Sequence, residues 1–159
     1  MADSQHKPKE PTIENRKARH DYFIEETLEC GLKLTGTEVK SVRNGQVSLA
    51  EGYVMATAIP LSLILHGVHI AEYAPANPAH QHLPTRPRNL LANKREIRKL
   101  ADRSAQRGYT LIPLKIYSLR GRAKLLVGVA RGKQKGDKRE AIAHREHKRE
   151  MDRAMSRRR

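Results

Sequence analysis

Four glutamates, Glu25, Glu26, Glu29 and Glu38, are the side chains most suited to acid–base chemistry. Two carboxylates at a suitable distance can act as a general acid and a general base. The sequence adds no nucleophile elbow, no phosphate-binding glycine-rich loop and no set of metal ligands to them. We therefore expect no enzymatic activity, and a solvated strand edge is an equally good interpretation of Glu25 and Glu26.

Lysine and arginine are in large excess. The 159 residues include 32 Lys and Arg against 17 Asp and Glu, which gives a formal net charge of +15 and a pI near 10.4. The basic residues gather in five clusters, at 16–20, 86–88, 93–95, 120–124 and 133–159. Such an excess predicts a polyanionic partner, either nucleic acid or an anionic membrane. On a face toward nucleic acid, Glu29 or Glu38 would accept hydrogen bonds from base amino groups or orient an arginine.

The membrane alternative has little support in the sequence. The longest apolar run, residues 58–65, is far shorter than the roughly 20 residues of a spanning helix. The first residues lack the apolar stretch of a secretory signal. A single cysteine, Cys30, cannot form an internal disulfide and suits a reducing compartment. We therefore expect a cytoplasmic protein whose partner is nucleic acid.

Histidines at 66, 69, 80 and 82 raise the question of a metal site. No cysteine pair accompanies them, and His66 and His69 are predicted on a strand, where an odd separation places side chains on opposite faces. We therefore expect no metal and no other cofactor. His80 and His82 are expected to contact RNA or solvent from a proline-rich loop.

Hydrophobic periodicity predicts the elements that position these residues. Alternation indicates strands over 22–34, 47–58 and 61–70. In the second, Val47, Leu49, Tyr53 and Met55 alternate, with Gly52 as a bulge or bend. Four prolines indicate a loop over 74–88. Helices are predicted over 37–44 and from the cap Asn93, with Glu96 at the capping-box position, to Gly108. A hairpin over 109–117 and 123–131 turns around Arg120 and Gly121.

These elements predict a mainly β fold with short helices, a small OB-like β-barrel over residues 15–132. Residues 1–14 are predicted to be a disordered arm. Residues 133–159 hold eleven Lys or Arg against five Asp or Glu and few apolar side chains. A helix formed by these residues would have no apolar face to bury. We therefore expect this basic tail to be disordered alone and helical on an RNA surface.

Four segments, 15–27 (NRKARHDYFIEET), 36–45 (GTEVKSVRNG), 88–97 (RNLLANKREI) and 130–140 (ARGKQKGDKRE), resemble the SsrA-binding protein family, also called small protein B. The resemblance implies an OB-like barrel that binds the tRNA-like domain of transfer-messenger RNA (tmRNA) and performs no chemistry itself. It implies delivery of this RNA to the A site of stalled ribosomes in bacterial trans-translation, which tags the nascent peptide for degradation.

Partners implied by the resemblance are tmRNA, the small ribosomal subunit and, indirectly, elongation factor Tu and alanyl-tRNA synthetase. The tail would occupy the empty messenger channel beyond the decoding centre, and the protein is expected to be a monomer. The RNA contacts implied for the barrel are Asn15, Arg16, Arg19, Tyr22, Glu29, Glu38, Lys40, Arg43, Leu91, Lys94, Arg95 and Lys124. Those implied for the ribosome-binding tail are Gly132, Lys133, Asp137, Lys138, Arg139, Arg153, Ala154 and Met155.

Two of these positions depart from simple expectation. By pattern alone Leu91 belongs in a core. Many relatives carry His or Tyr directly before the DKR triplet, where a ring can stack on a base, whereas this sequence has Gly136. The tail is therefore expected to depend more on charge and helix formation. A structural ribosomal protein or general RNA chaperone would share the charge and the small barrel, and stays open as the alternative.

Overall fold

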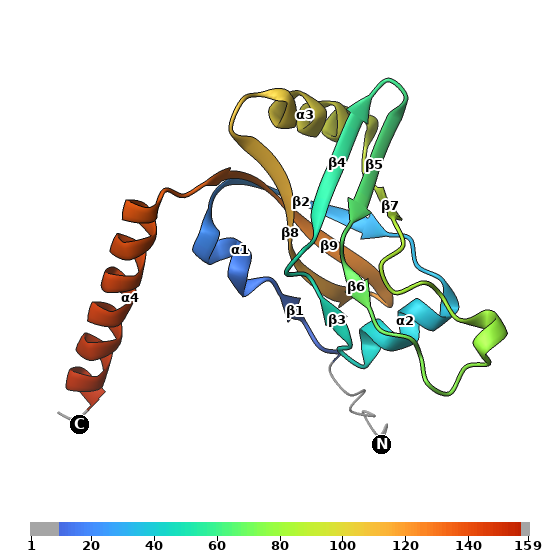
Figure 1. Cartoon of the computed structure of the whole chain (residues 1–159), viewed down its shortest axis with the longest axis horizontal. Coiled ribbons are helices and arrows are strands. Elements are labelled where there is room, and N and C mark those ends of the chain that lie inside the picture. Colours follow the sequence, from blue (N-terminus) through green and yellow to red (C-terminus); the bar gives the residue numbers. More distant parts are fainter. Residues whose placement is uncertain (1–9, 157–159) are drawn as a thin grey trace, which may run out of the picture.

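The computed structural model describes residues 10–156, and Figure 1 shows a ring of strands with helices on its outside. The long strands of the ring are β2 (Tyr22–Leu32), β8 (Tyr109–Leu119) and β9 (Arg122–Gly132), and the shorter ones are β4 (Tyr53–Ala58), β5 (Leu61–His66) and β7 (Arg88–Leu91). They pair in the order β8–β4–β5–β7–β2–β9, and β9 pairs again with β8. The pairing therefore closes on itself, and the predicted mainly β class is confirmed.

The ring begins earlier than the sequence suggested. Strand β1 (Ile13–Glu14) pairs antiparallel with β8, with Ile13 opposite Ile116. The predicted disordered arm of residues 1–14 therefore ends too late in the chain, since Ile13 and Glu14 join the sheet. Residues 1–9 of that arm lie outside the described residues.

The strand prediction over 47–58 had the wrong phase after Gly52. Val47–Ser48 forms β3, which pairs with β6 (His69–Ile70), and a break in the strand, a turn over residues 49–52, precedes β4. Val54 is 5% exposed, whereas Tyr53 and Met55 are about half exposed. A break that shifts the register by one residue moves every following side chain to the other face. A Cβ at Gly52 would lie 2.6 Å from Val68 Cγ2, so this break needs glycine.

Strand β7 was missed because it follows the four prolines of the predicted loop. The loop contains a short 3-10 helix, η1 (Pro78–His80), and Arg88–Leu91 then pairs with both β5 and β2. The alternation of a four-residue strand is too short to stand out. Leu90 is buried and Leu91 is 61% exposed, so the pattern-based assignment of Leu91 to the core is wrong.

Three helices pack on the ring; the second and third lie close to their predicted places, and the first was not predicted. They are α1 (Arg16–Asp21), α2 (Gly36–Arg43) and α3 (Lys94–Ala105). Helix α3 has the predicted capping box of Asn93 and Glu96. The β8–β9 turn has both Arg120 and Gly121 at positive φ, as a two-residue hairpin turn requires.

Aliphatic side chains form the core inside the ring, including Leu65, Leu111, Leu125 and Val127. A second, smaller cluster of Ala18, Ile112, Leu114 and Ala130 lies between α1 and the other face of β8 and β9. The middle of the β8–β9 hairpin is therefore buried on both faces, at the centre of the fold.

The basic tail forms helix α4 (Lys135–Ser156), which extends away from the ring in Figure 1. None of its residues is buried, and Ile142, Met151 and Met155 are 41–61% exposed. Helical structure agrees with the form expected on RNA, and disorder of the free tail stays a prediction. In residues 10–156 no helix combines the length and apolar content needed to cross a membrane.

Candidate nucleic-acid interface

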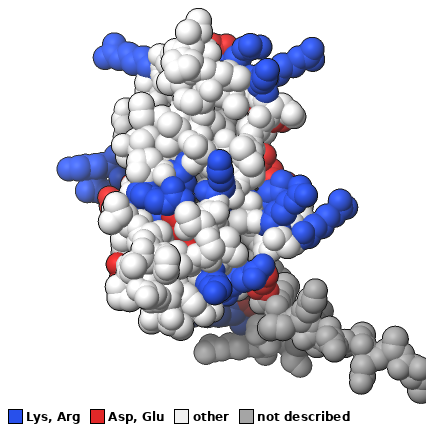
Figure 2. Space-filling model, turned by 90° about the vertical axis from the view of Figure 1, so that its right-hand side faces the viewer, with Lys and Arg blue, Asp and Glu red and all other residues white. Residues whose placement is uncertain are grey.

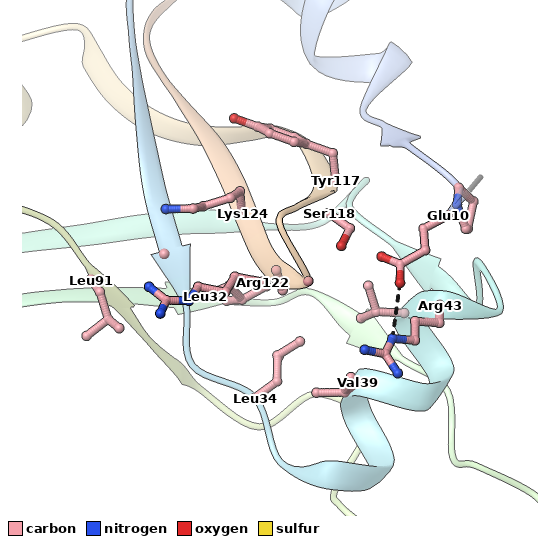
Figure 3. A pocket seen from close by; sticks show the side chains of 15 residues that line it. Glu10, Leu32, Leu34, Val39, Arg43, Leu91, Tyr117, Ser118, Arg122 and Lys124 are labelled. Carbon is pink, nitrogen blue, oxygen red and sulfur yellow. Dashed lines mark ion pairs between the residues drawn. The ribbon is translucent and has the colours of Figure 1, made fainter. Parts of the chain in front are cut away.

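A groove of about 410 Å³ lies where β2 ends, between β7, α2 and the β8–β9 turn (Figure 3). Its apolar lining includes Leu32, Leu34, Val39, Val42, Leu91 and Ala123. Arg43, Arg122 and Lys124 also line the groove, and Arg43 Nε lies 3.3 Å from Oε1 of Glu10, which belongs to the same lining (Figure 3). An apolar floor between cations can take the face of a nucleobase and the phosphate attached to it.

Glu29, Tyr117 and Lys124 form a polar cluster beside the groove. The Tyr117 hydroxyl donates to Glu29 Oε2, and Lys124 Nζ lies 3.8 Å from Glu29 Oε1. Burial and the hydrogen bond to Glu29 raise the pKa of Tyr117 to about 12. Tyr117 therefore stays neutral and donates, which leaves the rest of the Glu29 carboxylate to accept hydrogen bonds from a ligand.

Glu38 lies in a buried ion cluster behind the groove. Its carboxylate accepts from Arg86 Nε at 2.7 Å, from Arg88 Nε at 2.8 Å and from the Thr35 amide at 2.8 Å. Arg88 Nη1 donates to the carbonyl of Val68 and Nη2 to that of Pro84, both at 2.8 Å. Glu38 and Arg88 are 0% and 1% exposed. The cluster joins α2 to β7 and to the chain around β6.

Burial alone would raise the pKa of the Glu38 carboxyl, because it disfavours the charged form. The hydrogen bonds from Arg86, the Thr35 amide and Arg88 outweigh burial and lower the pKa to about 2. Glu38 is therefore ionised at neutral pH. The prediction that Glu38 contacts RNA directly is therefore wrong. Of the two roles expected for Glu38, it has the second, since its carboxylate orients two arginines.

Asn15 also has a structural role where an RNA contact was expected. Its side chain donates to the carbonyls of Leu49 at 3.1 Å and Pro113 at 2.9 Å, and accepts from the Ala18 amide as the cap of α1. It is 5% exposed. With its amide and carbonyl both satisfied internally, Asn15 holds α1 against β8 and has no free group for RNA.

The structure brings only part of the predicted set together. Arg43, Leu91 and Lys124 line the groove, with Glu29 beside it. Lys40 is on α2 with its ammonium 5.0 Å from the Tyr73 ring, and Lys94 and Arg95 are exposed in the first turn of α3. Arg16, Arg19 and Tyr22 belong to a separate region, at α1 and the start of β2.

The α1 region is where the tail begins. The Lys133 amide donates to the Asp21 carbonyl at 2.9 Å, and Lys133 Nζ donates to the Arg19 carbonyl at 3.2 Å. Lys138 Nζ lies 3.3 Å from Asp21. Hydrogen bonds from His20 and Lys138 lower the pKa of Asp21 against the effect of burial.

Most of the tail residues predicted to contact the ribosome lie outside the hydrogen bonds and ion pair with α1. Asp137 accepts from the Gln134 amide at 3.1 Å and caps the helix. Gly132 ends β9, opposite Tyr22. Arg139, Arg153, Ala154 and Met155 are exposed on α4. The first turn of α4 is thus fixed to α1, and the rest of the helix is free of the ring.

Comparisons with known proteins cover nearly the whole chain. The family model described as SmpB protein matches residues 12–157. The chain belongs to the SmpB family.

Curated relatives named SsrA-binding protein share about half of the residues. The relative from Roseiflexus castenholzii is 52% identical over 91% of this chain and 90% of its own length, and that from Lactobacillus delbrueckii is 53% identical over 88% and 90%. One solved structure, described as "tmRNA-SmpB: a journey to the center of the bacterial ribosome", matches with a TM-score of 0.65 and 45% identity. That match covers 83% of this chain and 94% of the other.

Lys and Arg side chains form a basic surface on the protein. Figure 2 looks onto the side that lies at the right of Figure 1, and Lys and Arg project there in several separate groups with few acidic atoms between them. The cluster at 86–88 was expected to belong to such a surface, but Arg88 is buried and Arg86 is paired with Glu38. These two arginines build the fold and do not contribute free charge.

Sequence reasoning also missed or misplaced polar groups. Tyr117 and Arg122 line the groove but were not singled out, although Arg122 lies in the basic cluster at 120–124 and Tyr117 ends a predicted strand. His82 was expected to contact RNA or solvent, and this is wrong: it is 7% exposed and bonds Thr37 Oγ1 and the Ile70 carbonyl. His80 is exposed. The described residues contain no group of three metal-ligating side chains.

Proposed function

We propose that this protein is a non-enzymatic RNA adaptor of trans-translation. Its strand ring binds the tRNA-like domain of tmRNA and delivers it to the A site of stalled ribosomes. Membership of the SmpB family over residues 12–157 is the observation that carries this proposal. The naming of relatives as SsrA-binding proteins, and of tmRNA, SmpB and the ribosome together for the matching structure, supports both partners.

The groove supports a particular mode of RNA binding. Leu91 presents an exposed apolar side chain, and Glu29 can accept hydrogen bonds from a base amino group. Lys124 and Arg43 can neutralise the neighbouring phosphates. Lys94 and Arg95, exposed in the first turn of α3 shortly after Leu91, add further positive charge.

The tail supports the second half of the adaptor role. Only its first turn is bonded to the ring, so the remainder can enter the empty messenger channel of the small subunit while the ring holds RNA. We infer that Arg139 and Arg153 to Met155 serve this contact from the unbonded part of the tail, and that Gly132, Lys133, Asp137 and Lys138 serve it from the segment where the tail leaves the ring. Elongation factor Tu and alanyl-tRNA synthetase are indirect partners through the bound RNA, and the protein acts as a monomer in the cytoplasm.

A competition titration tests the RNA preference. A labelled tRNA-like domain is bound at moderate salt and competed with unlabelled tRNA-like domain or with ordinary transfer RNA. Because non-specific phosphate contacts weaken as salt rises, the tRNA-like domain should compete at least about tenfold better. Equal competition by both RNAs would contradict the adaptor role and favour a general RNA chaperone or a structural ribosomal protein.

A further inference from the structure

Phe23 is the single phenylalanine of the chain, and it is 40% exposed on β2. Part of a large aromatic side chain is therefore open to solvent. It lies opposite Arg131 of β9, and Arg131 lies opposite Tyr109 of β8. Three neighbouring strands therefore present an aromatic, a cationic and an aromatic side chain in one row.

Two cations lie against the exposed ring. Arg131 Cζ is 5.8 Å and Lys133 Nζ is 5.0 Å from the ring centroid. Among the described residues, no acidic side chain pairs with either of them. We call Phe23, Arg131 and Lys133 the Phe23 cluster.

The acidic residues near the Phe23 cluster are already occupied. Glu25 binds Arg103 at 2.7 Å and the Tyr109 hydroxyl at 3.1 Å, and Glu26 binds Lys99 at 2.6 Å. Arg103 in turn lies 4.8 Å from the Tyr109 ring. The carboxylate charge is therefore neutralised locally, and the net charge beside Phe23 is positive.

We propose that the Phe23 cluster binds an unpaired nucleotide of RNA, with the base stacked on Phe23 and its phosphates held by Arg131 and Lys133. Every base has a π-face, so an exposed ring between cations suits this ligand regardless of sequence. The base displaces the cations from the ring, and they move to the phosphates. This inference rests on the proposed function and adds a contact outside both the groove and the free part of α4.

The position of the Phe23 cluster limits which RNA can supply the nucleotide. Lys133 belongs both to this cluster and to the hydrogen bonds that fix the tail to α1. A nucleotide stacked on Phe23 therefore lies at the root of α4, where the bound tRNA-like domain and the small-subunit RNA would both be near. Both are RNA with the same recognition chemistry, and separate binding measurements distinguish them.

The test uses the full chain and a tryptophan probe. The sequence has no Trp, so in Phe23→Trp a single indole reports on stacking. Its fluorescence should be quenched when the tRNA-like domain or the small ribosomal subunit is added. Met55→Trp is the matched control, because Met55 is 50% exposed on β4, a strand that contains no Lys or Arg; it should show no quenching.

Affinity gives the second readout. Phe23→Leu keeps an apolar side chain but removes the ring, and it should weaken binding to one of the two RNAs about tenfold, while Phe23→Tyr stays near wild type. A loss for the tRNA-like domain or for the small subunit alone supports the proposal and identifies the source. Unchanged affinity for both, with no quenching, overturns it. If the wild type still prefers the tRNA-like domain over transfer RNA in that case, the proposed function stands.

Discussion

Deletion of residues 135–159, which keeps Lys133 of the Phe23 cluster, is expected to abolish peptide tagging on stalled ribosomes while the tRNA-like domain still binds with an affinity within about threefold of the wild type. The reason is the division seen in the structure, since α4 has no buried residue and the groove lies on the ring. Removing an unburied helix should leave the core intact. Tagging is measured in a reconstituted translation reaction on a message without a stop codon, and binding by titration.

The converse variant is the control for this division. Lys94→Glu inverts the charge of an exposed residue on the ring surface, so it should weaken RNA binding and leave the tail unaltered. Arg98→Glu, on the same helix and also exposed, is the matched variant at a position with no proposed contact. Equal loss of RNA binding and of tagging in the tail deletion would refute the separation of the two roles.

Glu38→Ala is expected to destabilise the fold by about 3–5 kcal/mol, because it leaves two guanidinium groups without their buried partner. Helix α2 would lose its tie to β7, and the groove would lose the alignment of Arg43 with Leu91. Thermal unfolding measures the first effect and RNA titration the second. Glu25→Ala removes an exposed pair with Arg103 and should cost no more than about 1 kcal/mol; a similar small cost for Glu38→Ala would contradict the structural role.

The same carboxylate predicts a dependence of stability on pH. The pKa of Glu38 falls from an ordinary 4.5 to about 2 in the folded chain, so the unfolded chain binds its proton first. The carboxylate therefore contributes stability above about pH 4.5, and this contribution, on the order of 3 kcal/mol, is lost as the pH falls toward 2. Unfolding by denaturant, compared between wild type and Glu38→Gln, should show a smaller acid-induced loss in the variant.

Helix starts and tight turns were predicted from the sequence, because each depends on residues that are neighbours in the chain. Asn93 and Glu96 identify the start of α3 because a capping box is complete within four residues. Arg120 and Gly121 identify the β8–β9 turn because a two-residue turn is also formed by adjacent residues. The burial of the aliphatic strands followed from their alternation, except after Gly52, where a turn over residues 49–52 reversed the faces of Tyr53, Val54 and Met55.

Residues whose environment is formed by distant segments were not predictable in this way. Glu38 is buried because Arg86 and Arg88, about 50 positions further along the chain, return to it from the proline-rich loop. A motif match marks such a residue as important but does not separate a fold contact from an RNA contact. Leu91 was assigned to the core by its pattern, but it is exposed. Its exposure follows from the pairing of β7 with strands on both sides.

The central claim is that one molecule contacts tmRNA through its ring and the ribosome through its tail. Site-specific crosslinkers at positions 124 and 139 of the full chain, in a stalled ribosome complex that contains tmRNA, test it most directly. The proposed function predicts that position 124 crosslinks to the tRNA-like domain and position 139 to small-subunit RNA along the messenger channel. Crosslinks from both positions to the same RNA, or from position 139 to tmRNA alone, would contradict it.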